Sequence, residues 1–132
     1  MFLQVDNLQK KYDTKLILDN ISFKQKKGEI ISLIGASGIG KSTLLKCIAG
    51  LSDINLGSII LNKNEIHNLD ASQRKISYVF QESPLFPHMN VLQNILFNLR
   101  DYNHQRLDFL LKKTELTRLA NRFPYELSGG EN

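Results

Sequence analysis

The chain has 132 residues, of which 42% are hydrophobic and 23% are charged, so it can bury one modest core and has no compositional sign of disorder. The formal net charge is +4, and the excess is scattered apart from a short run at Lys24, Lys26 and Lys27. A scattered excess of this size is typical of a solvated surface, so no nucleic-acid partner is expected. The single cysteine, Cys47, excludes an internal disulfide and indicates a reducing, cytoplasmic setting. No apolar run approaches the roughly 20 residues that cross a bilayer.

The first part of the chain predicts a β-hairpin followed by a strand, a loop and a helix. Residues 1–8 and 16–23 are the expected hairpin strands, with KKYDTK as the turn between them. Residues 30–34 are nearly all apolar and mostly β-branched, a pattern that predicts a strand buried on both faces, as in a parallel sheet. After a glycine-rich loop, KSTLLKCIAGL has helical spacing and stops at Gly50.

The next part predicts two more strands. GSIILN at 57–62 is a short strand, and KISYVFQ at 75–81 returns to a buried one. Between them, Asp70 or Ser72 is suited to cap a short helical turn.

Beyond residue 83 the chain becomes helical. Pro84 and Pro87 keep ESPLFPHM open as a loop, and Asn90 is suited to cap the helix that follows. A second helix is expected at 105–114. The apolar positions expected to face inward are Val91, Leu92, Ile95, Leu96 and Leu99 in the first helix, and Leu107, Leu110 and Leu111 in the second.

GASGIGKST, residues 35–43, satisfies the pattern G-x-x-x-x-G-K-[ST] between an expected strand and an expected helix. Its glycines let the backbone approach phosphates, and successive N–H groups form a concavity at the positive end of the helix dipole. Lys41 is suited to place a positive charge on the β- and γ-phosphates of a nucleotide, Ser42 to offer its hydroxyl to Mg²⁺, and Thr43 to reach the α-phosphate side. This pattern alone does not choose among kinases, GTPases and transport ATPases. The predicted phosphate-binding residues are Gly35, Ala36, Ser37, Gly38, Ile39, Gly40, Lys41, Ser42 and Thr43.

Together with this P-loop, three stretches resemble the nucleotide-binding subunit of the ATP-binding cassette (ABC) family. Tyr12, in LQKKYDTK, matches the aromatic residue that stacks on adenine in that family, and SYVFQE matches the strand that ends in its Q-loop glutamine, here Gln81. LSGG matches the signature motif of the family, and its residues are Leu127, Ser128, Gly129 and Gly130. The motifs stand in the order of the family and cover the chain from end to end.

The resemblance implies an α/β fold, an incomplete ABC-type P-loop NTPase core with two additions. An antiparallel β layer is expected at residues 1–29, the P-loop α/β core at 30–82, and a helical arm that ends in the signature at 83–132. ATP and Mg²⁺ are the implied cofactors, with Ser42 and Gln81 as residues that hold the Mg²⁺.

The resemblance also implies partners. In the family, two domains pair head to tail, and each ATP lies between the P-loop of one and the LSGG of the other, so Ser128, Gly129 and Gly130 are expected to contact the ATP of a second ATP-binding subunit. SPLFPHMNVLQNILF is similar to the segment of bacterial importers that touches a membrane-spanning permease subunit. A peripheral place on the cytoplasmic face of the cell membrane follows, as does an ATPase activity by family.

The catalytic residues of the family are missing from this sequence. Its Walker B strand, which ends in Asp and Glu, and its switch His follow the signature, and no apolar run of residues 1–132 ends in Asp-Glu. We therefore expect nucleotide binding without turnover, and uncovered strand edges beside residues 30–34 because the missing strands belong to the same sheet. Three functions compete: the ATP-coupling subunit of an importer, represented by a truncated N-terminal part; a non-hydrolysing fragment or inactive remnant of a disrupted gene; and a non-transport ABC protein.

Overall fold

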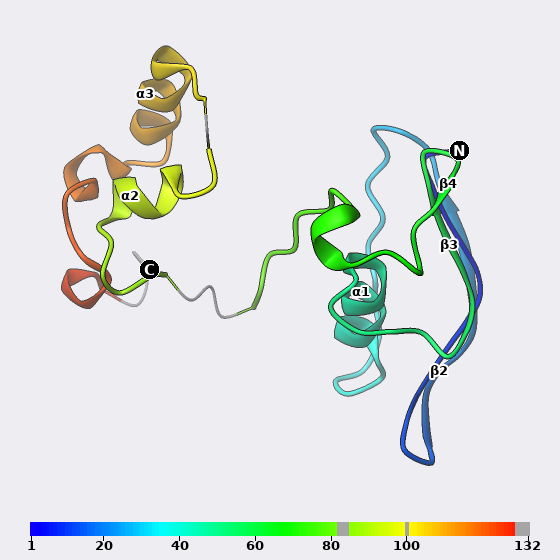
Figure 1. Ribbon diagram of the computed structural model, residues 1–132. Helices are drawn as coiled ribbons and strands as arrows, with labels where there is room; N and C mark the ends of the chain where they lie inside the picture. The colour runs from blue at the N-terminus through cyan, green and yellow to red at the C-terminus, as the bar shows by residue number, and fades with distance from the viewer. Residues whose placement is uncertain (82–84, 100, 129–132) are drawn as a thin grey trace. The chain divides into compact units, whose positions relative to one another are not determined.

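Residues 1–81, 85–99 and 101–128 are described by a computed structural model, and the chain divides into two units, Met1–Tyr78 and Val79–Asn132. The first unit holds the β-strands and helix α1, and the second holds helices α2 and α3 (Figure 1). No helix within the described ranges is long and apolar enough to cross a membrane.

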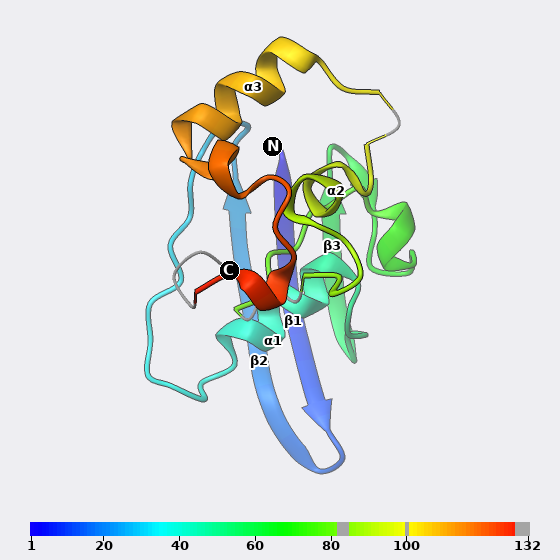
Figure 2. The same cartoon turned by 90° about the vertical axis from the view of Figure 1, so that its left-hand side faces the viewer.

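The first unit is built on a four-stranded antiparallel sheet in the order β2-β1-β3-β4, of which Figure 2 shows the three longer strands side by side. The strands are β1 (Leu3–Tyr12), β2 (Lys15–Gln25), β3 (Leu56–Leu61) and β4 (Asn64–Glu65). The hairpin and the strand after α1 are thus confirmed, although the hairpin turn is only Asp13 and Thr14. The antiparallel sheet also extends past residue 29, because β3 and β4 belong to it.

β1 carries a bulge that changes which side chains face the core. Between Val5 and Leu8, β1 advances by one residue more than its partner β2, and Asn7 in this stretch has a φ of 48°. Because side chains alternate with a period of two, the extra residue puts Leu8 on the face that Val5 occupies, and both are fully buried. Lys10 and Tyr12 follow Leu8 at even spacing and therefore share this face.

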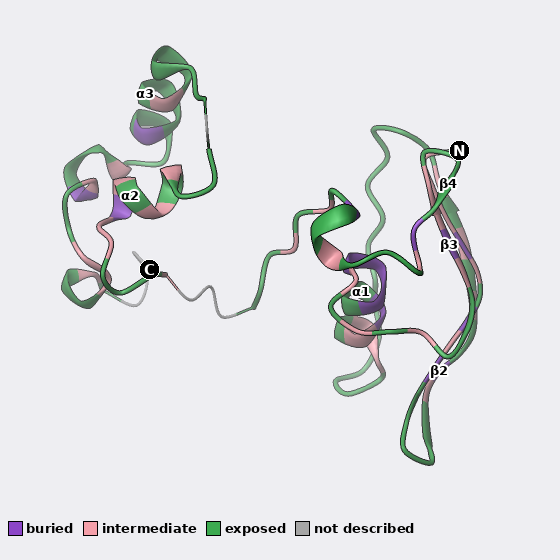
Figure 3. Ribbon diagram, viewed as in Figure 1, coloured by how far each residue is buried: buried purple, intermediate pink, exposed green. Residues whose placement is uncertain are grey.

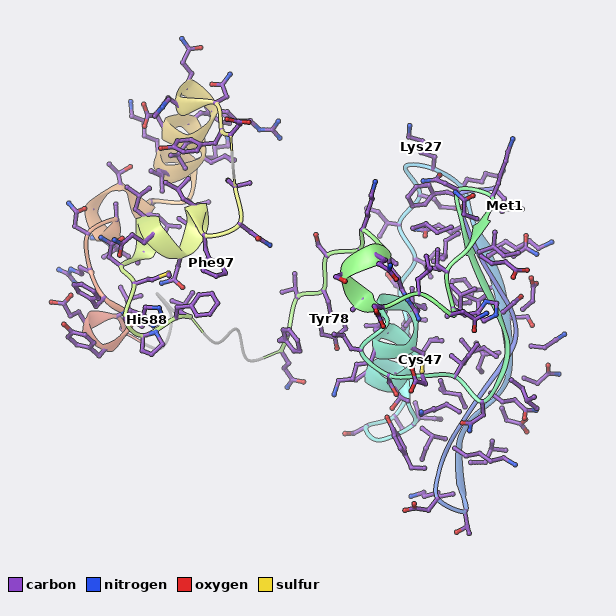
Figure 4. All side chains as sticks on the ribbon, viewed as in Figure 1. Met1, Lys27, Cys47, Tyr78, His88 and Phe97 are labelled. Atoms are coloured by element: carbon purple, nitrogen blue, oxygen red, sulfur yellow. The ribbon has the colours of Figure 1, made fainter. Side chains whose placement is uncertain are left out.

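Helix α1 (Lys41–Ala49) packs on the sheet, and its buried residues lie on the side of the helix that faces the strands (Figure 3). The core of the unit consists of Val5, Leu8, Leu18, Leu44, Cys47, Ile48, Ile59 and Ile66. Cys47 is fully buried, and its side chain lies between α1 and the sheet (Figure 4). Gly50 ends the helix with a φ of 80°, and the N–H of Leu51 donates to the carbonyl of Lys46 at 2.9 Å, so the predicted stop is confirmed.

A buried arginine, Arg74, ties the segment after β4 to the end of α1. Its Nη1 donates to the carbonyls of Cys47 and Ile48 at 2.7 and 3.1 Å. Nε and Nη2 donate to the carbonyls of Leu69 and His67 at 2.8 and 2.9 Å. The Cys47 carbonyl also accepts from the N–H of Gly50 at 3.3 Å, so the guanidinium adds a donor at carbonyls in the last turn of the helix, which lack the usual partner within the helix. Burial also lowers the pKa of Arg74.

The short helical turn expected near Asp70 is confirmed. It covers η1 (Ala71–Gln73), with Asp70 rather than Ser72 at its N-cap, and the N–H of Asp70 donates to Oε1 of Gln73 at 3.2 Å. This turn leads directly into Arg74, which places the guanidinium at the end of α1.

The strands predicted at 30–34 and 75–81 are not found, so that prediction is wrong for the described residues. Ile30, Ile34 and Val79 are 91%, 95% and 84% exposed, although their apolar pattern predicted burial on both faces. A strand is stable when its N–H and C=O groups pair with a neighbour, and within the described ranges no strand pairs with either segment.

The second unit consists of short helices: α2 (Val91–Leu96), α3 (His104–Lys113), η2 (Leu116–Leu119) and η3 (Pro124–Glu126). Asn90 caps α2 as predicted, since its Oδ1 accepts from the N–H of Gln93 at 2.8 Å and the N–H of Asn90 donates to Gln93 Oε1 at 2.9 Å. The N–H of Val91 donates to the carbonyl of Arg122 at 2.9 Å, which joins the start of α2 to the chain after η2.

The inward faces of these helices are only partly as predicted. Val91 and Leu111 are buried, whereas Leu110 is 47% exposed and Leu99 lies beyond the end of α2 and is 51% exposed. A helix of six residues cannot bring Leu99 onto the same face.

Candidate nucleotide-binding site

The P-loop, residues 35–43, links the extended segment after β2 to the first turn of α1 (Figure 1). Lys41 Nζ donates to the carbonyl of Gly35 at 2.8 Å and to that of Ala36 at 2.7 Å. The side chain therefore reaches back over the loop and holds its first residues around a positive charge. An ammonium has three N–H donors, and these two bonds use two of them.

Gly38 and Gly40 have backbone conformations that favour glycine, with φ of 79° and 103°. At Gly40, a Cβ atom would lie 2.9 Å from Leu18 Cδ2 and 3.1 Å from the carbonyl oxygen of Ile17. The loop thus packs closely on β2, and a side chain at Gly40 would press on the Leu18 methyl group and the Ile17 carbonyl.

The start of α1 is left open to an anion. Gly40 stands at the N-cap without a capping side chain, and the first turn contains no acidic residue. The positive end of the helix dipole is therefore not neutralised by the helix itself. Ser42 is exposed and Thr43 is half-buried in this turn. An ammonium, hydroxyl groups and helix N–H groups form a donor set that fits a polyphosphate, and a hydroxyl oxygen is a ligand type that Mg²⁺ accepts.

Tyr12 ends β1 and is 48% exposed. Its hydroxyl lies 3.4 Å from Oγ of Ser52, just after the end of α1. Lys10 Nζ lies 4.9 Å from the centre of the ring. Lys10 also pairs across the sheet with Leu18 of β2, and Leu18 is the residue against which Gly40 packs. Tyr12 therefore belongs to the same hairpin as the residue against which Gly40 of the P-loop packs.

The remaining predicted site residues belong to the second unit. Gln81 is exposed, Leu127 is half-buried and Ser128 is exposed, while Gly129 and Gly130 lie outside the described residues. Because the two units are described separately, the structure does not bring these residues to the P-loop. Their roles stay predictions.

The second unit shows how the loop after Gln81 is shaped. Asn94 Oδ1 accepts from the N–H of Phe86 at 2.8 Å, and its Nδ2 donates to the carbonyls of Phe86, Met89 and Asn90 at 3.2, 3.0 and 3.0 Å. The ring centres of Phe86 and Phe97 lie 4.4 Å apart, and these two residues are 41% and 55% exposed. One amide side chain thus holds residues 86–90 in a turn that presents aromatic surface, near the labelled His88 and Phe97 of Figure 4.

Sequence reasoning missed three residues of these arrangements: Lys10, Ser52 and Arg74. Lys10 stands two residues before Tyr12 in an alternating strand, and this spacing was a usable signal. Ser52 and Arg74 act through long-range contacts that no local pattern reveals.

Comparisons with known proteins give one consistent answer. The sequence profile of a family described as ABC transporter matches residues 18–132. The chain is 42% identical to the Fe(3+) ions import ATP-binding protein FbpC of Haemophilus influenzae, covering 98% of this chain and 40% of that protein. The Sulfate/thiosulfate import ATP-binding protein CysA of Synechocystis is 37% identical over 99% of this chain and 39% of its own length. The Spermidine/putrescine import ATP-binding protein PotA of Aliivibrio fischeri is 34% identical over 98% and 36%.

Solved structures agree with the sequences. A dimeric bacterial ABC transporter cassette, MJ0796, matches with a TM-score of 0.81 and 32% identity, covering 98% of this chain and 64% of that one. The same cassette in a dimeric post-hydrolysis state, bound to ADP and Pi, matches equally well. The fold is that of a P-loop NTPase cassette, and this chain spans 36% to 40% of the length of these curated relatives.

Proposed function

We propose, given that this chain belongs to the ABC transporter family, that it is the N-terminal part of the ATP-binding subunit of an importer and binds ATP with Mg²⁺ at the P-loop. The observation that carries the proposal is the Lys41 ammonium, held by the carbonyls of Gly35 and Ala36 at the open start of α1. Its relatives are import ATP-binding proteins, and the similar cassette holds ADP and Pi.

Each residue has a separate part in this binding. Lys41 exchanges its two loop carbonyls for phosphate oxygens, which form stronger charge-assisted hydrogen bonds. The amides of the loop and of the α1 start bind the remaining oxygens. Ser42 and Gln81 would hold Mg²⁺, which would supply positive charge against the phosphates. The ring of Tyr12 stacks on adenine.

The partners are proposed from the relatives. In a head-to-tail pair, Ser128, Gly129 and Gly130 contact the ATP of a second ATP-binding subunit, as the dimeric state of the similar cassette suggests. The turn at residues 86–90, with exposed Phe86 and Phe97, is the proposed contact with a membrane-spanning permease. This arrangement puts the chain on the cytoplasmic face of the membrane. Three relatives with import names favour transport over a non-transport ABC protein.

We further propose that the 132-residue chain does not turn over ATP by itself. Its sequence contains no apolar run that ends in Asp-Glu, the pair that positions Mg²⁺ and the attacking water in the family. A truncated or remnant chain that only binds nucleotide is the second candidate, and the exposed side chains of Ile30 and Ile34 favour it. Steady-state phosphate release above buffer that is abolished in Lys41→Ala would contradict this proposal.

Equilibrium binding of ATP tests the main proposal. Lys41→Ala removes the phosphate contact and is expected to weaken binding about tenfold or more. Lys46→Ala is the matched control, because it removes the same charge from an exposed position in the last turn of the same helix. We expect the control to bind as the unchanged chain does. Equal affinities of the unchanged chain and Lys41→Ala would contradict a P-loop site.

A further inference from the structure

Lys10 is an unusual lysine, because only 9% of it is exposed. Lysine is rarely buried unless its ammonium has a partner. In the described part of the chain, that partner is an aromatic ring: Nζ lies 4.9 Å from the centre of the Tyr12 ring, and no hydrogen bond or ion pair of this ammonium is found there. A cation at this distance over a tyrosine face is attracted by the ring, more strongly when it is shielded from water.

The bulge in β1 creates this pair. The extra residue at Asn7 shifts the alternation of the strand, so that Lys10 and Tyr12 follow Leu8 on the inner face. Without it, both side chains would point to the opposite face. The strand irregularity therefore places a cation under the ring.

The ring of Tyr12 is held at two points. Lys10 covers one face, and the hydroxyl lies 3.4 Å from Oγ of Ser52. Tyr12 as a whole is 48% exposed, so part of the residue is accessible to a ligand. A ring fixed in this way loses less rotational freedom when a flat ligand stacks on it.

We propose that Lys10 is a positioning residue for the nucleotide base: its ammonium holds the Tyr12 ring so that the uncovered face receives a purine. This inference rests on the proposed function, in which Tyr12 stacks on adenine. Lys10 also faces Leu18 across the hairpin, and Leu18 packs against Gly40 of the P-loop. Lys10 and the P-loop thus both lie next to Leu18, and we expect only the base-dependent part of the affinity to depend on Lys10.

The test compares ATP with inorganic tripolyphosphate, which has the phosphates but no base. Lys10→Met keeps the apolar stem in its buried site and removes the charge, and we expect ATP binding about three- to tenfold weaker with unchanged tripolyphosphate binding. Lys10→Arg keeps a cation over the ring and is expected to restore ATP affinity. Lys11→Met, an exposed neighbour with the same change of charge, is the matched control and is expected to bind both ligands normally.

The outcomes separate this inference from the proposed function. If the unchanged chain binds ATP and Lys10→Met binds it equally well, Lys10 has no such role. Equal losses for ATP and tripolyphosphate in Lys10→Met would mean a general structural role and would also overturn the inference. If the unchanged chain binds neither ligand, the proposed function fails, and this inference fails with it.

Discussion

At Gly40 the P-loop lies so close to β2 that a Cβ atom would make tight contacts. Gly40 combines a φ of 103° with a Cβ position 2.9 Å from Leu18, whereas Gly28 has a φ of 81° and nothing within 4 Å of its Cβ position. Gly28→Ala therefore adds only backbone strain, expected to cost about 1 kcal/mol, and Gly40→Ala adds a steric clash for a total of about 2–4 kcal/mol. Urea unfolding of both variants measures the difference, and equal costs would contradict the close packing.

Burial raises the pKa of the Cys47 thiol above its usual 9.0. The folded state thus holds the thiol neutral while the unfolded state releases its proton at lower pH. Its contribution to the free energy of unfolding is present below pH 9.0 and is lost as the pH rises through the raised pKa. We expect the chain to lose more stability than Cys47→Ala between neutral pH and about pH 10 in urea unfolding. Parallel losses would show that this thiol does not contribute.

At the scale of elements, α1 depends on Arg74 at its last carbonyls. Arg74→Met fills similar space but removes the guanidinium donors to the carbonyls of Cys47, Ile48, Leu69 and His67, so we expect a loss of about 2–5 kcal/mol in the free energy of unfolding. Arg74→Lys keeps the positive charge but lacks the planar guanidinium with its several N–H donors, so it should recover only part of the lost stability. Denaturant unfolding decides this, and a loss below about 1 kcal/mol in Arg74→Met would rule out the anchoring role.

Elements with local signals could be predicted from the sequence. The hairpin, α1 with its stop at Gly50 and the cap at Asn90 each depend on residues within a few positions of one another. The segments at 30–34 and 75–81 could not be predicted, because a strand also needs a neighbour that its own letters do not specify. The bulge could not be predicted for a different reason: it turns Lys10 toward the core, whereas lysine usually prefers the surface.

The same difference between local and long-range contacts decides which parts of the candidate site could be predicted. The P-loop was visible as a motif because its chemistry needs adjacent residues, and Lys41 indeed closes over Gly35 and Ala36. The support behind Tyr12 was not visible, because Ser52 reaches it from a distance of 40 residues along the chain.

At the scale of the whole molecule, the described structure has one well-packed core beside exposed apolar segments. Ile59 is fully buried on β3, whereas Ile34 is 95% exposed. Ile59→Ala should lower the free energy of unfolding by about 2–5 kcal/mol, while Ile34→Ala should change it by less than about 0.5 kcal/mol. Ile34→Ala should also reduce the fluorescence of a dye that binds apolar surface. A large destabilisation by Ile34→Ala would mean that this segment is covered in solution.

The most direct test of the ATP site is residue-resolved NMR of backbone amides during titration with ATP and Mg²⁺. We predict that the largest shifts fall on residues 35–43, with further shifts at Lys10, Tyr12 and Ser52, because the phosphates meet the loop and the base meets the ring. Amides of the exposed neighbour Lys46 should move less. Saturating ATP that leaves residues 35–43 unshifted, or shifts scattered over the chain without a maximum there, would contradict the account.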